Sequence, residues 1–269
     1  MVSYDVCEKE GTAMPHAPVN DIELYFEEYG RTDGPPLLLV HGFSGAGTVW
    51  EPFLSGFADR FRVIVPDLRA HGRSSGALET IHHRTFALDL VGLLDHLSIE
   101  RAHFIGHSSG GMSLLFVGTE TPHRVLTLTL VNATYTFPEK TRDYMRQLVA
   151  ELPNQEAIAD LRRRHGPYHD ENHWQVLSQA FLAFTENPVE LPFRPEDLAA
   201  IQAPVLIMHG DRDEFFPVSI PVTMYTHMPR AELCILPRAG HDVPAQYPQI
   251  FLKLVNDFID QSMDVGSPP

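Results

Sequence analysis

The sequence predicts an α/β fold with a mostly parallel central sheet, flanking helices and an inserted helical cap. Short runs rich in Val, Ile and Leu lack polar alternation, which is typical of strands covered on both faces. Longer stretches with apolar residues at helical spacing separate these runs, as expected for strands joined by crossover helices. One long interval contains only helix-like stretches and therefore predicts an insertion.

The predicted elements alternate along the chain. A weakly alternating stretch at residues 20–29 ends at Gly30 and predicts an edge strand or hairpin. Central strands are predicted at residues 37–40, 62–65, 102–105, 125–131, 204–208 and 232–236. Helices are predicted at residues 49–57, 84–97, 109–119 and 247–262.

The interval after Asn132 is too long for a structureless loop in a compact domain. Its helix-like pieces, at residues 139–151, 155–164 and 172–184, predict a helical cap over residues 133–203. The alternative is a separate helical domain, but the strand pattern resumes afterwards as though uninterrupted. Residues 19–132 and 204–262 then form one core, and residues 1–18 and 263–269 are expected to be loose tails.

Composition and charge narrow the possible partners. The chain has 269 residues, with 20 Lys and Arg against 35 Asp and Glu, and a net charge of −15. Such an acidic surface repels phosphate backbones and anionic lipids, so neither nucleic acid nor a membrane is an expected partner. The sequence contains two cysteines, no apolar run near the ~20 residues of a membrane span, and no signal-peptide pattern at residues 1–18. We therefore expect a cytoplasmic protein without a disulfide framework.

The most informative motif is Gly106-His107-Ser108-Ser109-Gly110, between a predicted strand and a predicted helix. This G-x-S-x-G pattern places a serine on a tight strand-to-helix turn at the carboxyl end of the sheet. The N-terminus of the following helix favours the negative charge that develops in acyl transfer. Because a serine hydroxyl is a weak nucleophile, Ser108 requires a neighbouring base that is oriented by an acid.

An acid and a base follow in the required order, each after a predicted strand. Asp211 and Asp213 follow one strand, and His241 follows the next. We prefer Asp213 as the acid, because Asp211 directly follows a glycine and is suited to holding the turn. Glu214 is a third candidate for the acid. His241 is the candidate base, since His227 falls within a predicted helix.

A glycine-rich loop, His41-Gly42-Phe43-Ser44-Gly45-Ala46-Gly47, directly follows the first central strand. Acyl transfer requires two N–H donors aimed at the developing oxyanion. The candidate donors are the backbone amides of Phe43, in this loop, and of Ser109, directly after the serine. A phosphate-binding loop is the alternative, but the glycines do not follow G-x-G-x-x-G and no Gly-Lys-Ser/Thr follows.

These motifs together resemble the α/β-hydrolase superfamily, in particular its capped esterases, lactonases and cofactor-free haloperoxidase-like enzymes. The resemblance covers about residues 19–259 and includes Pro66-Asp67-Leu68-Arg69-Ala70-His71-Gly72-Arg73-Ser74 and Ala239-Gly240-His241. It implies Ser108 as nucleophile, His241 as general base and acid, Asp213 as orienting carboxylate, and no cofactor. The family usually has glycine where Ala70 stands, which is a small change in a structural loop.

The expected function is hydrolysis of a small to medium carboxylic ester or lactone through an acyl-enzyme. Haloperoxidase-like enzymes and C–C bond hydrolases often carry Met at the position of Ser109, so the serine favours esters. The alternatives are C–C bond hydrolysis, perhydrolysis or acyl transfer by the same triad, and ligand sensing by a hydrolase fold. We expect a monomer or homodimer that acts on a small molecule.

Aromatic and histidine side chains are candidates for the substrate pocket. The candidate pocket residues are Trp50, His107, Phe137, Trp174 and Phe215.

Two clusters of ionisable residues lie in the predicted cap. His165, His169 and His173 are four residues apart, but Gly166-Pro167 interrupts their helix, so we expect solvated side chains and no metal site. Arg162-Arg163-Arg164 is interpreted as a solvated helix face, with an anion site as the alternative.

Overall fold

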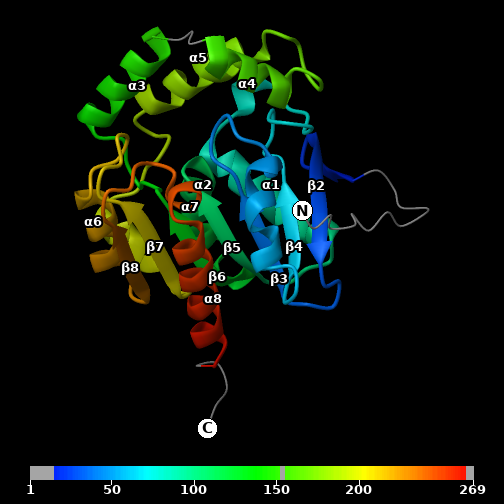
Figure 1. The fold of residues 1–269 in the computed structure, drawn as a ribbon, viewed down its shortest axis with the longest axis vertical. Coiled ribbons are helices and arrows are strands. Elements are labelled where there is room, and N and C mark those ends of the chain that lie inside the picture. The colour runs from blue at the N-terminus through cyan, green and yellow to red at the C-terminus, as the bar shows by residue number, and fades with distance from the viewer. Residues whose placement is uncertain (1–14, 152–154, 265–269) are drawn as a thin grey trace.

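The computed structural model describes residues 15–151 and 155–264, which form one eight-stranded sheet with helices on both faces (Figure 1). The strand order is β1-β2-β4-β3-β5-β6-β7-β8; β1 and β2 pair antiparallel, β2 pairs antiparallel with β4, and the remaining pairs are parallel. The predicted α/β fold with a mostly parallel sheet is therefore confirmed. The strands are β1 His16–Val19, β2 Ile22–Gly30, β3 Pro36–Val40, β4 Arg62–Pro66, β5 Ala102–His107, β6 Val125–Val131, β7 Val205–Gly210 and β8 Ala231–Leu236.

Two apolar cores, one on each face, explain why the central strands are continuously hydrophobic. In β3, Leu38 and Val40 belong to the core that also contains Phe86 of α1, whereas Leu37 and Leu39 belong to the core with Phe251 of α8. Burial of both faces leaves no position for polar alternation. The helices of the sheet region are α1 His83–His96, α2 Ser109–Glu120, α6 Ser219–His227, α7 Val243–Gln246 and α8 Pro248–Asp264, with 3-10 helices η1 Gly47–Gly56, η2 Leu78–Thr80, η3 Pro122–Arg124 and η4 Pro195–Ala200.

Three helices lie between β6 and η4: α3 Glu139–Glu151, α4 Gln155–His165 and α5 His173–Glu186. Figure 1 shows them together above one end of the sheet, with α5 packed against both α3 and α4. We call residues 133–203 the helical insertion. Within the described ranges, 15–151 and 155–264, no helix is long and apolar enough to cross a membrane.

Beyond shifts of one or two residues at the ends of elements, the sequence-based assignments differ from the structure at three places. The helix predicted at residues 49–57 is the 3-10 helix η1, which contains Pro52, a residue without the N–H that an α-helix requires. Residues 16–18 of the predicted tail at 1–18 form β1, in which buried Ala17 pairs with Leu24; residues 1–14 lie outside the described residues. Helix α8 extends to Asp264, so the second predicted tail begins later, and residues 265–269 are not described.

Parallel register brings the carboxyl ends of the strands to one edge. Val40 of β3 pairs with Gly106 of β5, and His107 pairs with Val131 of β6. Gly210, the last residue of β7, pairs with Leu236 of β8. The loops that follow these strands therefore meet at the end of the sheet where ligands of open α/β folds bind.

Candidate active site

Ser108 stands on a sharp turn between β5 and α2. Its φ of 51° and ψ of −119° are a backbone conformation that side-chain-bearing residues rarely adopt. Glycines make the turn possible: a Cβ at Gly106 would lie 2.6 Å from the amide nitrogen of Gly111, and one at Gly110 would lie 2.5 Å from the carbonyl oxygen of Val40. The close approach of strand and helix places the serine side chain outward at the carboxyl end of the sheet.

The structure brings Ser108, His241 and Asp213 into one line of hydrogen bonds. His241 Nε2 lies 3.0 Å from Ser108 Oγ, and His241 Nδ1 lies 3.1 and 3.0 Å from Asp213 Oδ1 and Oδ2. A carboxylate accepts hydrogen bonds, so Nδ1 carries the hydrogen. In the neutral imidazole Nε2 is then the acceptor for the serine hydroxyl, which is the arrangement that activates a serine.

Asp213 is buried and held by several donors. Its Oδ1 accepts the backbone amides of Phe215 and Phe216 at 2.8 and 3.0 Å, and its Oδ2 accepts the side-chain amide of Asn132 at 2.8 Å. Burial by itself would raise the pKa of Asp213, but the hydrogen bond and charge of His241, together with Asn132, hold that pKa below its usual value. The carboxylate is therefore ionised at neutral pH and fixed in orientation.

The other two candidate acids contact the backbone instead. Asp211 is exposed, and its amide donates to the carbonyl oxygen of Leu236 at 3.0 Å, which joins the ends of β7 and β8. Glu214 Oε2 accepts the backbone amide of His241 at 3.2 Å. Of the three carboxylates, Asp213 is the one whose oxygens hydrogen-bond the imidazole of His241.

His107 holds the backbone of His241. Its Nε2 lies 2.9 Å from the carbonyl oxygen of His241, to which it donates. Burial, reinforced by the charge of His241, lowers the pKa of His107 to about 4, so the ring is neutral at physiological pH. His107 therefore positions the neighbouring histidine rather than exchanging protons with Ser108.

The glycine-rich loop passes directly beside the nucleophile. A Cβ at Gly42 would lie 3.2 Å from Ser108 Cβ, which places the following residue, Phe43, next to the serine. Ser109 begins α2, so its N–H is among those without an acceptor inside the helix. The two candidate oxyanion donors thus belong to residues on either side of Ser108 that line the same cavity.

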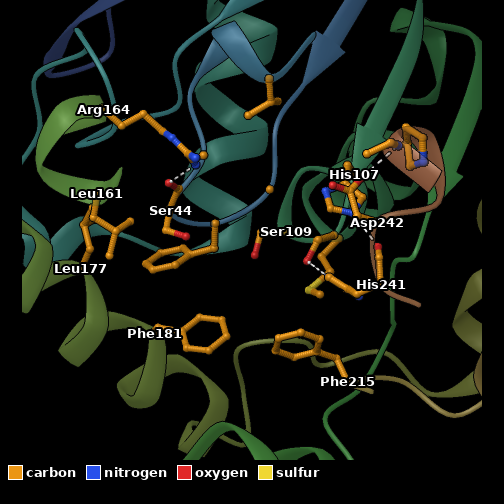
Figure 2. Close-up of a pocket in the computed structure, with 18 of the residues that line it drawn as sticks. Ser44, His107, Ser109, Leu161, Arg164, Leu177, Phe181, Phe215, His241 and Asp242 are labelled. Carbon is orange, nitrogen blue, oxygen red and sulfur yellow. Dashed lines mark hydrogen bonds between the residues drawn. The ribbon is translucent and has the colours of Figure 1, made fainter. Parts of the chain in front are cut away.

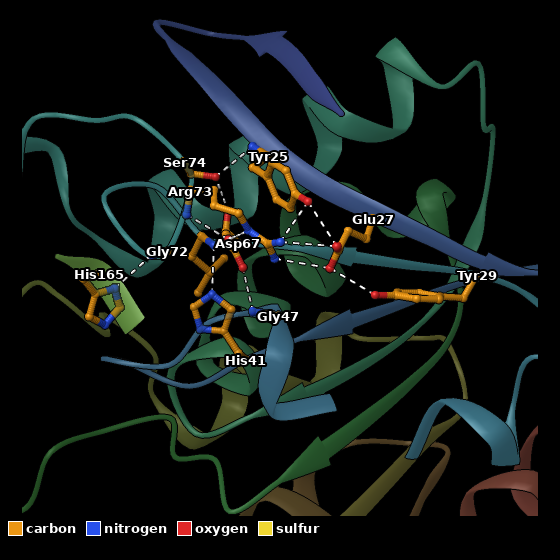
Figure 3. Close-up of polar contacts among 11 residues, drawn as sticks. Tyr25, Glu27, Tyr29, His41, Gly47, Asp67, Gly72, Arg73, Ser74 and His165 are labelled. Atoms are coloured by element: carbon orange, nitrogen blue, oxygen red, sulfur yellow. Dashed lines mark hydrogen bonds and ion pairs between the residues drawn. The ribbon is translucent and has the colours of Figure 1, made fainter. Parts of the chain in front are cut away.

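A largely buried ionic network centred on Asp67 holds the glycine-rich loop in place (Figure 3). Asp67 accepts the amide of Gly47 at 2.6 Å, and the amide and Nε of Arg73 at 2.9 Å each. Arg73 also donates to the hydroxyl of Tyr25 at 2.8 Å and forms an ion pair with Glu27 at 3.2 Å. Asp67 therefore holds both the glycine-rich loop and the turn at residues 67–74.

The prediction that His165 is solvated is wrong. His165 ends α4 and is fully buried, because its ring inserts between two loops of the core. Its Nδ1 accepts the backbone amide of Gly72 at 2.9 Å, and its Nε2 donates to the carbonyl oxygen of Ser44 at 3.0 Å. One side chain of the insertion therefore holds both the turn at residues 67–74 and the glycine-rich loop.

The other two histidines of this cluster are also not fully solvated. His173 is buried and its Nε2 donates to the carbonyl oxygen of Ala70 at 2.7 Å, while the ring of His169 stacks on it with centroids 4.0 Å apart. The four-residue spacing predicts that these histidines share a helix face, but it does not predict that loops of the core cover that face. Within residues 15–151 and 155–264, no three His, Cys, Asp or Glu side chains are arranged to hold a metal ion.

A cavity of about 750 Å³ opens above Ser108, between the sheet and the helical insertion (Figure 2). Ser109 and His241 lie on one side of it, and Phe181 and Phe215 face them across the space. Ser108 lines the same cavity. Most of the wall is apolar, which suits a substrate with a hydrocarbon part. The insertion contributes Phe137, Met145, Leu161, Leu177, Phe181 and Phe184.

Four of the five candidate pocket residues line this cavity: Trp50, His107, Phe137 and Phe215. Trp50 is also part of the core, since its ring packs on Phe251 with centroids 6.1 Å apart. Trp174 does not line the cavity, because it lies in the first turn of α5, one turn before Leu177, where the cavity wall begins on that helix.

The interpretation of Arg162-Arg163-Arg164 as a solvated helix face is wrong for Arg164. Its side chain is 28% exposed and lines the cavity, where its Nη1 donates to the carbonyl oxygen of Ser44 at 3.0 Å. It also forms an ion pair with Asp160. Arg163, by contrast, is 68% exposed, as expected for a helix face in water.

Comparison with known proteins gives a consistent result. A family model described as alpha/beta hydrolase fold matches residues 35–193. RutD of Caulobacter sp. (strain K31), named for carbamate hydrolysis, is 30% identical over 258 residues, which cover 88% of this chain and 95% of RutD. A 2-hydroxy-6-oxononadienedioate/2-hydroxy-6-oxononatrienedioate hydrolase of Burkholderia vietnamiensis is 26% identical and covers 89% of this chain and 91% of its own. The solved structure of Est816, titled an N-acyl homoserine lactone degrading enzyme, superposes with a TM-score of 0.75 at 27% identity over 91% of this chain and 100% of its own.

Proposed function

The chain belongs to the α/β-hydrolase fold family, and from this premise we propose that it is a serine hydrolase that cleaves a carboxylic ester or lactone through an acyl-enzyme. The observation that carries the proposal is the hydrogen-bonded line from Ser108 through His241 to Asp213, which opens onto an apolar cavity. A nucleophile, a base and an orienting acid within hydrogen-bond reach are the parts that acyl transfer needs.

The reaction proceeds in two halves. Ser108 Oγ attacks the substrate carbonyl carbon while His241 Nε2 takes its proton, and the resulting oxyanion accepts hydrogen bonds from the amides of Phe43 and Ser109. His241 then gives the proton to the leaving alcohol, which departs and leaves the acyl group on Ser108. Water attacks this ester with His241 again acting as base, and the free acid leaves. Asp213 keeps Nδ1 protonated and stabilises the imidazolium in both halves.

The helical insertion acts in this proposal as a cap. Its apolar side chains line the cavity opposite Ser108, so a bound acyl chain is shielded from water. The cavity size of about 750 Å³ supports a small to medium substrate.

A second candidate is cleavage of a C–C bond next to a carbonyl. The similarity to the Burkholderia vietnamiensis hydrolase supports it, since the substrate in that protein's name carries a 6-oxo group. Hydrolysis of a carbamate is a related possibility that the similarity to RutD supports.

The test is hydrolysis of p-nitrophenyl esters from acetate to palmitate, with Ser108→Ala prepared in parallel. We expect a maximum at one chain length and a loss of at least about 10⁴-fold in kcat for the variant. A p-nitrophenyl carbamate and a 2-hydroxy-6-oxo dienoate serve as competing substrates. Turnover confined to one of those two replaces the ester assignment, and undiminished ester turnover in Ser108→Ala refutes the nucleophile.

A further inference from the structure

A second line of buried polar side chains reaches the cavity beside the nucleophile. His83 Nε2 lies 3.2 Å from Ser109 Oγ, and His83 Nδ1 lies 2.6 Å from Glu190 Oε1. Ser109 and His83 are buried, and Glu190 is 4% exposed. None of these side chains takes part in the line formed by Ser108, His241 and Asp213, so their burial requires another explanation.

Glu190 is held as an ionised acceptor. Its Oε1 also accepts the backbone amide of His83 at 2.8 Å, and its Oε2 accepts His82 Nδ1 at 2.8 Å. Burial by itself would raise the pKa of Glu190, but the hydrogen bonds and charge of His83 hold that pKa below its usual value. A buried carboxylate is costly unless several donors satisfy it, as here.

The direction of the hydrogen bonds follows from this carboxylate. Because Glu190 only accepts, His83 Nδ1 carries the hydrogen, and in the neutral imidazole Nε2 accepts the hydroxyl hydrogen of Ser109. The oxygen of Ser109 then has lone pairs left for another donor. Ser109 lines the cavity, and Figure 2 shows its side chain pointing into that space.

We propose that Ser109, held by His83 and Glu190, is a specificity-determining residue that accepts a hydrogen bond from a hydroxyl or amide N–H on the carbon next to the reacting carbonyl of the substrate. The inference rests on the proposed ester hydrolysis and names its substrate class. In that reaction the carbonyl oxygen lies at the amide of Ser109, and only Cα and Cβ separate this nitrogen from Oγ. A polar group that reaches Oγ is therefore attached close to the carbonyl carbon.

The neighbouring aromatic rings fix the position of the hydrogen-bonded line from Ser109 through His83 to Glu190, which we call the relay. The ring of His83 packs edge-on against Phe184 with centroids 4.9 Å apart and lies 6.2 Å from the ring of Phe137. Both phenylalanines line the cavity. A substrate without a polar group near the carbonyl leaves the acceptor at Ser109 unpaired among these apolar walls, which is unfavourable.

The test uses three ethyl esters that differ at one atom position: butanoate, 2-hydroxybutanoate and 2-methoxybutanoate, with both enantiomers of each substituted ester. Acid release is followed in a pH-stat, and kcat/KM is measured for each. The hydroxyl donates a hydrogen bond, whereas the methoxy group only accepts. We expect one 2-hydroxy enantiomer to exceed its 2-methoxy analogue by about tenfold or more, and Ser109→Ala to remove most of that ratio.

Two further variants separate the relay from a structural role. His83→Phe keeps a ring at this position, and Glu190 keeps the backbone amide of residue 83 and His82 as donors. The variant removes the acceptor that holds the hydroxyl hydrogen of Ser109, so that hydrogen is free to point into the cavity and the hydroxy-to-methoxy ratio falls several-fold. His82→Ala is the matched control, because it removes a partner of Glu190 that is not hydrogen-bonded to Ser109; its ratio stays at the wild-type value. A merely structural role lowers kcat/KM for all three esters together and leaves the ratio unchanged.

The outcomes distinguish this inference from the proposed function. Ser108-dependent hydrolysis with the same ratio in wild type, Ser109→Ala and His83→Phe overturns the relay and leaves the ester hydrolase intact. A wild-type ratio near one also overturns it. If no ester is hydrolysed by the folded wild-type protein, the proposed function fails and the substrate class falls with it. If Ser109→Ala does not fold, the ratio in His83→Phe decides.

Discussion

Replacing His165 with phenylalanine removes the side chain through which α4 holds two core loops. The larger cost arises at Gly72, whose buried amide donates to His165 Nδ1 at 2.9 Å and would be left facing an apolar ring. An unsatisfied buried donor costs about 1–3 kcal/mol. The carbonyl oxygen of Ser44 also loses His165 Nε2, but Arg164 still donates to it at 3.0 Å, so this loss is smaller.

We therefore expect His165→Phe to lower the free energy of unfolding by about 2 kcal/mol, which corresponds to a fall in Tm of about 4–8 °C for a chain of this size. Urea unfolding followed by circular dichroism measures the change at pH 7.5. The control is His123→Phe, at an exposed position of η3, where we expect a change within about 0.5 kcal/mol. A His165→Phe protein as stable as the control would show that this contact does not hold the insertion to the core.

Three further predictions concern the acid, the turn and the pH dependence of stability. Asp213→Asn should lower kcat by about 10⁴-fold with the fold retained, because the carboxylate that fixes the tautomer of His241 is lost. Asp211→Asn, at an exposed position, should keep a kcat near the wild-type value. The reverse order of the two variants in the ester assay would identify Asp211 as the acid. Gly110→Ala places a Cβ 2.5 Å from the carbonyl oxygen of Val40, so we expect a folded protein to lose at least about 100-fold in kcat, and near-normal activity would argue against the tight turn. Burial lowers the pKa of His165 from 6.5 to about 4, so the stability that its neutral ring contributes is complete above pH 6.5 and is lost as the pH falls toward 4. Urea unfolding at a series of pH values should show this group contributing about 1.4 kcal/mol per pH unit in that window, and His165→Phe should lack the contribution.

The residues found from the sequence share one property: their signal is local. Ser108 directly follows β5, and Asp213 and His241 lie in the loops that follow β7 and β8. Parallel strands bring such positions together without further information. Asn132 also directly follows a strand and hydrogen-bonds Asp213, so the same rule could have found it.

The residues that were missed or misplaced depend on how the insertion packs. Glu190 contacts His83 because the segment after α5 lies against the start of α1. Neither segment contains a sequence pattern that predicts this contact. His165 was assigned to solvent because its spacing identifies a helix face but not the loops that cover it. Trp174 has the residue type of a pocket wall, yet it precedes the turn of α5 where the wall begins.

The most direct test of the central claim is to label the nucleophile covalently. A fluorophosphonate reacts with an activated serine, and tandem mass spectrometry of the tryptic peptide distinguishes Ser108 from the adjacent Ser109. We predict one adduct per chain, on Ser108, with ester turnover lost in proportion to labelling and no adduct in Ser108→Ala. An adduct on Ser109, or complete labelling of Ser108 with ester turnover unchanged, would contradict the account.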